Sequence, residues 1–217
     1  MKSTRTTWAR TGVMAVVVGC GLATLSACVP LMVGGAVMGG LVVSDRRTTG
    51  TVVEDEGIEL RTATRIRERI GDRVHVNVIS YNRQVLLTGE APTEQDKEQI
   101  EKIAADVENV RNVVNEIGIM GNSTLTQRSN DAIVTGRVKA ALLDARDLFA
   151  NAFKISTTRG TTYVMGRVTE REARRATDVI SAQTGVQRVV RILEVISEDE
   201  LARLQPKPVA PNMPLPK

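Results

Sequence analysis

An internal repeat restricts the fold of this chain more than any other feature of its sequence. The stretch "VLLTGEAPTEQDKEQIEKIAADVENVRNVVNEI" aligns with "TYVMGRVTEREARRATDVISAQTGVQRVVRIL". Gly89 falls opposite Gly166 at an offset of 77 residues, and Thr93 falls opposite Thr169 at an offset of 76. A solenoid needs about three or more repeats to bury its core, so two copies indicate two small domains instead.

Each copy has the same succession of hydrophobic patterns, which predicts the order α-β-β-α-β and an α+β fold class for two tandem small domains. We place these domains at residues 51–121 and 124–196. The first helix of the first copy is predicted from Ala63, Ile66 and Ile70. The buried face of the corresponding helix in the second copy is predicted from apolar residues at helical spacing, namely Val134, Val138, Ala141, Ala145 and Leu148.

The remaining elements follow from alternation, turns and caps. Val74, Val76 and Val78 alternate with polar residues, which is typical of a half-buried strand. A turn at Asn82-Arg83, or at Arg159-Gly160, leads to a second strand that a glycine is expected to close. The "TERE" that begins at Thr169 has the spacing of a capping box, so a helix should start there.

The N-terminus has the pattern of a targeting segment. Three basic residues precede an apolar run from Gly12 to Leu25, and Ser26-Ala27 supply the small residues of a cleavage site. Residues 1–27 are therefore predicted to be a signal peptide. An uncleaved membrane helix from Thr11 to Val43 would be long enough to cross a bilayer, but Pro30 and several glycines interrupt that stretch.

The motif "LSAC", which ends at Cys28, resembles the lipobox of bacterial lipoproteins. The resemblance implies that the Cys28 thiol is lipidated and becomes the mature N-terminus, with permanent anchoring through several acyl chains. Val29 follows the cysteine in place of Asp, which by the same resemblance favours the outer membrane. Residues 28–50 are then a lipidated N-terminus and Gly-rich tether, and residues 205–217 are a Pro-rich, disordered tail.

The two copies resemble the BON domain, a small αββαβ module of bacterial envelope proteins. The resemblance lies in the "VLLTGEA" and "YVMGRV" strands, the "TE" helix starts, and the endings "VENVRNVVNEI" and "TGVQRVVRILEVI". Together with the lipobox, the chain resembles the family of dual BON-domain outer-membrane lipoproteins. This implies domains that face the periplasm, binding of anionic phospholipid through the second copy, support of outer-membrane integrity, and enrichment at the division site.

Composition argues against several other classes of protein. Without residues 1–27 the chain has 26 basic and 25 acidic residues, so a globally basic partner of nucleic acid is not indicated. His75 is the only histidine, and it is expected to be an ordinary solvated or half-buried strand residue. We therefore predict no catalytic residues, no metal site, no cofactor and no enzyme. The carboxylates of Glu54, Asp55 and Glu56 are expected to form a solvated run before the first helix.

Charge divides the two copies. Residues 51–121 have 9 basic and 14 acidic side chains, whereas residues 124–196 have 12 basic and 7 acidic side chains. An anionic leaflet attracts Lys and Arg near its surface, so the second copy is the better candidate for membrane contact. In the first copy, Arg61, Arg65 and Arg69 recur at helical spacing, and we favour a structural role for them opposite acidic helices over lipid binding.

A lipid-binding surface is predicted on the first helix of the second copy. An apolar ridge on the side away from the core, rimmed by cations, is what a helix at a membrane interface presents. The residues assigned to this surface are Ile133, Arg137, Lys139, Ala140, Leu143 and Arg146. Asp144 and Asp147 oppose it. The alternatives are packing of the same ridge against the first copy and scattered surface apolar residues, which are common in proteins.

The sequence therefore predicts an outer-membrane lipoprotein whose partners are anionic phospholipids such as phosphatidylglycerol and cardiolipin. The alternative is a non-enzymatic adaptor whose BON domains bind an envelope protein or a peptidoglycan-associated partner.

Overall fold

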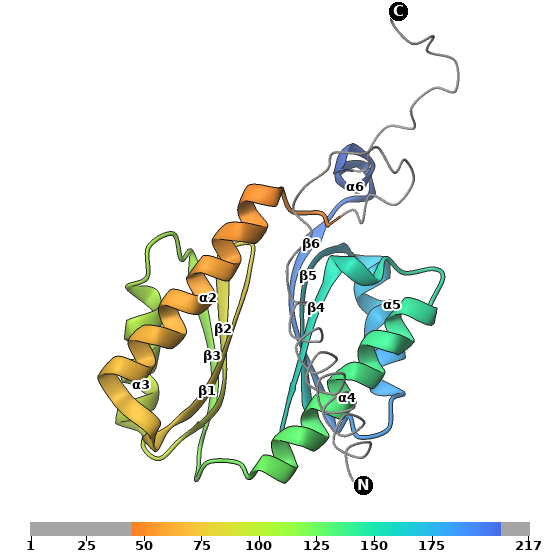
Figure 1. Ribbon diagram of the computed structural model, residues 1–217. Helices are drawn as coiled ribbons and strands as arrows, with labels where there is room; N and C mark the ends of the chain where they lie inside the picture. The colour runs from red at the N-terminus through yellow and green to blue at the C-terminus, as the bar shows by residue number, and fades with distance from the viewer. Residues whose placement is uncertain (1–44, 205–217) are drawn as a thin grey trace, which may run out of the picture. The chain divides into compact units, whose positions relative to one another are not determined.

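The structure is a computed structural model and describes residues 45–204. Figure 1 shows the arrangement, and its labels are used below. All described residues belong to one compact unit. Along the chain the helices and strands are α2 (Thr49–Ile70), η2 (Gly71–Arg73), β1 (His75–Tyr81), β2 (Gln84–Ala91), α3 (Glu94–Ala105), β3 (Asn112–Ile119), α4 (Leu125–Asp144), η3 (Ala150–Ala152), β4 (Phe153–Thr158), β5 (Thr161–Thr169), α5 (Glu170–Ser181), β6 (Arg188–Ile196) and α6 (Glu198–Leu204).

The predicted α-β-β-α-β order and the α+β class are confirmed in both copies. Each copy has a three-stranded sheet in the order β1-β2-β3 or β4-β5-β6. The first two strands pair antiparallel and the last two pair parallel, in equivalent registers. Two helices cover one face of each sheet, α2 and α3 in the first copy and α4 and α5 in the second (Figure 1).

Each copy has its own hydrophobic core between its sheet and its helices. Ile58, Ile66 and Ile70 from α2 pack with Leu87 and Ile117 in the first copy. In the second copy, Val138 from α4, Val164 from the central strand and Ile180 from α5 form the equivalent core.

The opposite faces of the two sheets form a third apolar cluster that joins the copies. Its members come from both domains: Ile79, Tyr81 and Leu86 from the first copy, and Tyr163, Met165 and Ile192 from the second. Both sheets are therefore buried on both faces near their centres, and the copies pack through their strands.

The two repeated glycines lie inside strands β2 and β5 and do not close them, contrary to the sequence prediction. Gly89 has φ +117°, and a Cβ atom there would lie 2.0 Å from the His75 carbonyl oxygen. A Cβ atom at Gly166 would lie 2.4 Å from the Ala152 carbonyl oxygen. Glycine is required at both positions because the neighbouring backbone approaches where a side chain would stand.

The first helix starts earlier than the sequence suggested. Thr48 caps α2 by accepting a hydrogen bond from the Thr51 amide, so Thr49 and Gly50, expected in the tether, belong to the helix. The predicted capping box at Thr169 is confirmed. The signal peptide, Cys28 and the Pro-rich tail lie outside the described residues. Within residues 45–204, no helix combines the length and apolar character needed to cross a membrane.

Candidate functional site

The candidate lipid-binding helix, α4, begins at a strong cap and ends sooner than its apolar spacing predicted. Thr124 and Gln127 form a reciprocal capping box at its N-terminus. Val134, Val138 and Leu142 are its buried residues. The prediction omitted Leu142 and named Ala141 and Ala145, which are only half-buried. Leu148 does pack against the core, as predicted, but from beyond the helix, which ends at Asp144 and is followed by an extended ψ of 90° at Ala145.

The predicted ridge of α4 faces away from the core of its own domain. Ile133 is 59% exposed and Leu143 is 67% exposed, and Ala140 is exposed between them. The alternative, in which this ridge packs against the first copy, is wrong, because the copies meet through their sheets.

The predicted cations are arranged less uniformly. Lys139 is exposed beside the ridge. The Arg137 guanidinium donates a hydrogen bond to the Thr184 carbonyl oxygen, which fixes it over the end of α5. Arg146 lies beyond the end of the helix, so it is near the ridge in sequence but is not part of the same helical face.

A shallow cavity of about 350 Å³ lies at the C-terminal end of α4. Lys139 and Leu143 line it together with Phe153 and Ile155 from β4. Asp45, the first described residue, also lines it. The polypeptide therefore enters the folded body beside the ridge that the sequence assigned to lipid.

Asp45, Arg46 and Arg47 form a segment that we call the N-terminal clasp, because it binds both copies. The Arg46 guanidinium donates hydrogen bonds of 2.8 and 2.7 Å to the two carboxylate oxygens of Glu172 on α5. Both side chains are about 5% exposed. Burial alone would raise the pKa of Glu172, but the hydrogen bonds from Arg46 and the Thr169 amide outweigh it and lower the pKa.

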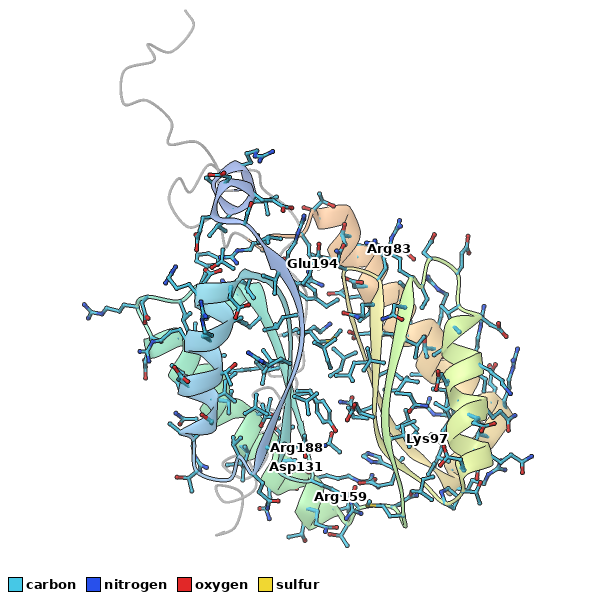
Figure 2. All side chains as sticks on the ribbon, turned by 180° about the vertical axis from the view of Figure 1, so that it is seen from behind. Arg83, Lys97, Asp131, Arg159, Arg188 and Glu194 are labelled. Carbon is cyan, nitrogen blue, oxygen red and sulfur yellow. The ribbon has the colours of Figure 1, made fainter. Side chains whose placement is uncertain are left out.

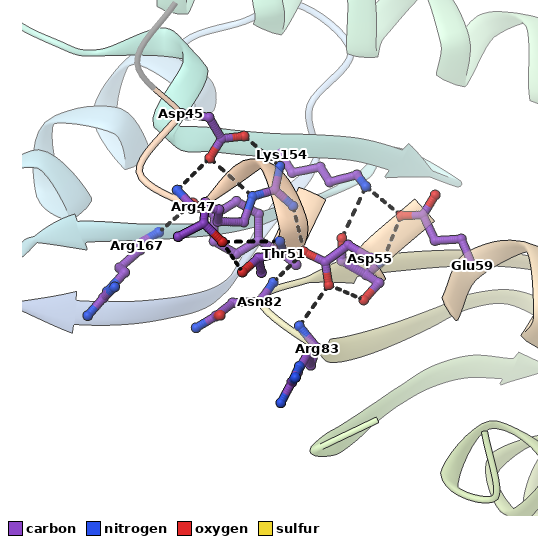
Figure 3. A network of polar contacts seen from close by, with 12 residues as sticks. Asp45, Arg47, Thr51, Asp55, Glu59, Asn82, Arg83, Lys154 and Arg167 are labelled. Carbon is purple, nitrogen blue, oxygen red and sulfur yellow. Dashed lines mark hydrogen bonds and ion pairs between the residues drawn. The ribbon is translucent and has the colours of Figure 1, made fainter. Parts of the chain in front are cut away.

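Arg47 connects the same segment to the first copy (Figure 3). It lies 2.7 Å from an Asp55 carboxylate oxygen and 4.2 Å from the centre of the Tyr81 ring. Asp55 is fully buried and accepts hydrogen bonds from the amides of Asn82 and Arg83 and from the Ser80 hydroxyl. Glu54, Asp55 and Glu56 were expected to form a solvated run before the first helix. This expectation is wrong for Asp55, which is a buried hydrogen-bond acceptor within α2.

Asp131 on α4, 76 residues after Asp55, also accepts hydrogen bonds from two successive turn amides, in this case within the second copy. Its two carboxylate oxygens accept hydrogen bonds of 2.8 and 3.0 Å from the amides of Arg159 and Gly160. Figure 2 labels Asp131 and Arg159 in this arrangement. Residues in these turns have positive φ angles, which point successive amides toward one acceptor. The first helices of the two copies align at an offset of 76, one less than the 77 of Gly89 and Gly166, and only an alignment of these helices pairs the two carboxylates.

Glu90 is the second fully buried carboxylate that joins the copies. It accepts hydrogen bonds from Arg159 of the second copy, from the linker residue Ser123, and from His75 when that ring nitrogen is protonated. Burial alone would raise its pKa, but the hydrogen bond from Arg159 and those from Ser123 and His75 lower it.

This cluster does not have the geometry of a catalytic triad. The Ser123 hydroxyl and the Glu90 carboxylate both approach the same His75 nitrogen, Nδ1, at 3.5 and 3.0 Å. A triad needs the nucleophile and the carboxylate on opposite ring nitrogens. His75 is half-buried, as predicted. No group of three metal-ligating side chains occurs within the described part of the chain.

The arginines of α2 act structurally where their contacts are defined. Arg73, just after the helix, pairs with Asp96 of α3 at 2.6 Å, and the Arg65 guanidinium donates to the Asp106 carbonyl oxygen. Arg61 pairs within its own helix, with Glu54. The expected neutralisation of the acidic second helix is therefore carried by Arg73 rather than by Arg61.

Comparisons with known proteins agree with this architecture. The family model described as BON domain matches residues 59–120 and 130–197. The outer membrane lipoprotein DolP of Haemophilus influenzae is 30% identical over 174 residues, which cover 79% of this chain and 90% of that protein. A protein named 21 kDa hemolysin from Actinobacillus pleuropneumoniae is 30% identical over 70% of this chain and 79% of its own length.

Among solved structures, CdsD, described as a structural protein of the type III secretion system of Chlamydia trachomatis, matches 70% of this chain and 96% of its own. It is 14% identical with a TM-score of 0.28, a value too low to support a shared arrangement. The family model and the relatives of 30% identity are sufficient to assign the family. The chain belongs to the BON-domain family, with two BON domains, and within it to the group of the outer membrane lipoprotein DolP.

Proposed function

We propose that this chain is a non-enzymatic outer-membrane lipoprotein that binds anionic phospholipid through α4 of its second BON domain. Binding would hold the folded domains against the inner surface of the outer membrane and support its integrity, with a role at the division site. The outward face of α4, with exposed Ile133, Ala140 and Leu143 and with Lys139 beside them, is the observation that carries the proposal.

The two helices of the second copy provide an internal comparison. α5 covers the same sheet, and its outward residues include the exposed arginines Arg171, Arg174 and Arg175, as expected of a solvated helix. α4 instead exposes Ile133, Ala140 and Leu143 on its outward face. Because two helices on one sheet differ in this way, the apolar exterior of α4 is not a general feature of the helices of the second copy. Apolar side chains in the headgroup region with cations beside them are the usual means of interfacial binding.

The charges of the second copy suit an anionic partner. Residues 124–196 contain 12 basic and 7 acidic side chains, and each cation near an anionic leaflet contributes about 1 kcal/mol. Asp147, which could oppose binding, is paired with Arg175 at 2.8 Å. Asp144 remains exposed near Leu143 and reduces the attraction.

The place where the chain enters the folded body supports the same orientation. Asp45 lines the cavity beside Leu143, and Cys28 precedes it by 17 residues. Seventeen residues span at most about 60 Å when fully extended. That length is sufficient for α4 to contact the membrane surface when Cys28 is lipidated.

Co-sedimentation of residues 29–217 with vesicles tests the proposal without interference from acyl chains. These residues contain the complete compact unit. We expect binding that rises with the content of phosphatidylglycerol or cardiolipin and falls with salt. Leu143→Glu should abolish most of it. Val195→Glu is the matched control, because Val195 is 55% exposed in the same copy but lies on β6. Equal binding by both variants, or none by the unmodified chain, would refute the proposal.

The adaptor alternative rests on a different surface. Val53 and Leu60, seven residues apart on α2, are 63% and 70% exposed in the acidic first copy. A protein partner with a basic, apolar face would fit them. An adaptor would ignore lipid composition in the vesicle experiment and would lose its partner on Leu60→Glu.

A further inference from the structure

A second cavity, of about 330 Å³, lies where α2 ends and the linker between the copies begins. Its apolar lining comes from Ala63 and Ile66 of α2, from Val74 just before β1, and from Val76 within β1. Asn122 of the linker and Arg128 of α4 complete the wall. The first copy, the linker and the second copy thus all contribute to one cavity.

Cations outnumber anions in the lining of this cavity. Arg67 and Arg128 line it, and among the described residues neither has a carboxylate within ion-pair distance. The Arg128 Nε donates to the Ser123 hydroxyl at 3.1 Å, which orients the guanidinium and leaves its two terminal nitrogens available. His75 also lines the cavity, with its Nδ1 within hydrogen-bond distance of the buried Glu90. Asp72 is the one acidic residue of the lining.

We propose that this cavity binds the headgroup of an anionic phospholipid. The lining holds one arginine from each copy, and guanidinium groups bind the oxygens of a phosphodiester in a planar, two-pronged manner. The apolar residues of the same lining would contact the glycerol and the first methylenes of the lipid. A free anion would use the arginines alone and gain nothing from Ile66, Val74 and Val76.

The position of the cavity connects it to the surface already assigned to lipid, so this inference rests on the proposed function and extends it. Arg128 stands near the N-terminus of α4, and Leu143 lies 15 residues later, or about 22 Å along the helix axis. Leu125, one turn before Arg128, is 78% exposed. α4 would therefore lie along the membrane with a headgroup contact at each end, and the first copy would contribute Arg67 to one of them.

Chemical-shift mapping of residues 29–217 with dihexanoyl-phosphatidylglycerol, below its micelle concentration, tests the site directly. We expect the amides of Val74, His75 and Asn122 to shift in a saturable manner. Inorganic phosphate at the same concentration should shift them much less. Equal shifts with both compounds would mean that the cavity binds an anion without its lipid portion, and would overturn the proposal, as would no shift with either.

A pair of variants on α2 tests the contribution to membrane binding. Arg67→Gln removes a cation from the cavity, whereas Arg69→Gln removes one from the same helix that does not line it. Vesicles containing phosphatidylglycerol should bind the first variant about fivefold more weakly, the effect of one cation near an anionic surface. Binding of the Arg69→Gln variant to the same vesicles should weaken by less than about twofold. Equal losses would reduce the effect to general electrostatics and refute the site.

Leu143→Glu in the same titration separates the two proposals. If this variant loses binding while Arg67→Gln does not, the ridge of α4 binds lipid and the cavity proposal fails. If Arg67→Gln weakens binding while Leu143→Glu does not, the cavity binds lipid and the α4 proposal fails.

Discussion

Arg46 and Glu172 form a buried two-pronged ion pair across 126 residues of sequence, with N–O distances of 2.8 and 2.7 Å. Arg46 precedes the first BON domain, and Glu172 lies on the last long helix of the second. The segment that precedes the first domain is therefore anchored in the second domain.

Arg46→Met should destabilise the folded chain by about 3–5 kcal/mol, because it leaves the Glu172 carboxylate buried without its partner. Urea denaturation measures the loss. Arg174→Met is the control, since Arg174 and Glu170 lie 3.8 Å apart and are more than half exposed. Arg174→Met should change the free energy of unfolding by no more than about 0.5 kcal/mol. Similar losses for both variants would mean that the buried pair contributes no more than a surface contact.

Asp55 is a fully buried carboxylate on α2. Asp55→Ala should cost about 3 kcal/mol or more, because two backbone amides, the Ser80 hydroxyl and Arg47 lose their shared acceptor. Glu56→Ala, one residue along and exposed, should change the free energy of unfolding by less than about 0.5 kcal/mol. Thermal denaturation of the two variants checks this. A neutral Asp55→Ala would remove the structural role given to this side chain.

Leu142 and Leu143 are adjacent on α4, but the first is buried and the second is exposed, so their substitution should affect different properties. Leu142→Ala should destabilise by about 2–5 kcal/mol, because Leu142 is 1% exposed and its removal leaves a void. Leu143→Ala should leave stability within about 0.5 kcal/mol. It should weaken binding to phosphatidylglycerol vesicles about tenfold, since burying a leucine contributes about 1.5 kcal/mol or more. If Leu143→Ala binds vesicles like the unmodified chain, the assigned ridge is incorrect.

Two glycines should respond in opposite directions. Gly89→Ala should cost about 3 kcal/mol or more, given its φ of +117° and the His75 carbonyl oxygen 2.0 Å from the new Cβ. Gly136→Ala, on α4 with no atom within 4 Å of the new Cβ, should stabilise by about 0.5–1 kcal/mol. The melting temperatures of the two variants measure this contrast. Two shifts of the same sign would contradict it.

The lowered pKa values of Glu172 and Glu90 predict a loss of stability in acid. The unfolded chain takes up protons near the ordinary glutamate value of 4.5, at which the folded carboxylates are still ionised. Stability is therefore complete at neutral pH and is lost as the pH falls below 4.5 through the folded values. Glu172→Gln should make this dependence shallower in denaturation curves between about pH 3 and 6. Parallel curves would show that Glu172 is not linked to folding.

Local patterns predicted the repeat, the order of elements and the capping box at Thr169, because each depends on residues close in sequence. The ridge of α4 was also predictable, since helical spacing fixes which residues share a face. The end of α4 was not, because Ala145 and Leu148 continue the apolar spacing although the backbone has already turned.

The long-range contacts could not be predicted from such patterns. Arg46 and Arg47 looked like the charged end of a tether, and their partners Glu172 and Asp55 are defined only once both copies have folded. Asp55 was the exception that alignment of the first helices could have found, since Asp131 lies 76 residues later and faces the equivalent turn. Sequence alone also gave no indication that the outer faces of the two sheets join.

The ion pair of Arg46 has a consequence for how the molecule is made. Synthesis proceeds from the N-terminus, so Arg46 is made 126 residues before Glu172. The first BON domain can form its own contact with the clasp early, because Arg47 pairs with Asp55 of α2. The contact of Arg46 needs a chain that extends through α5, so the clasp closes in full only when both domains are present.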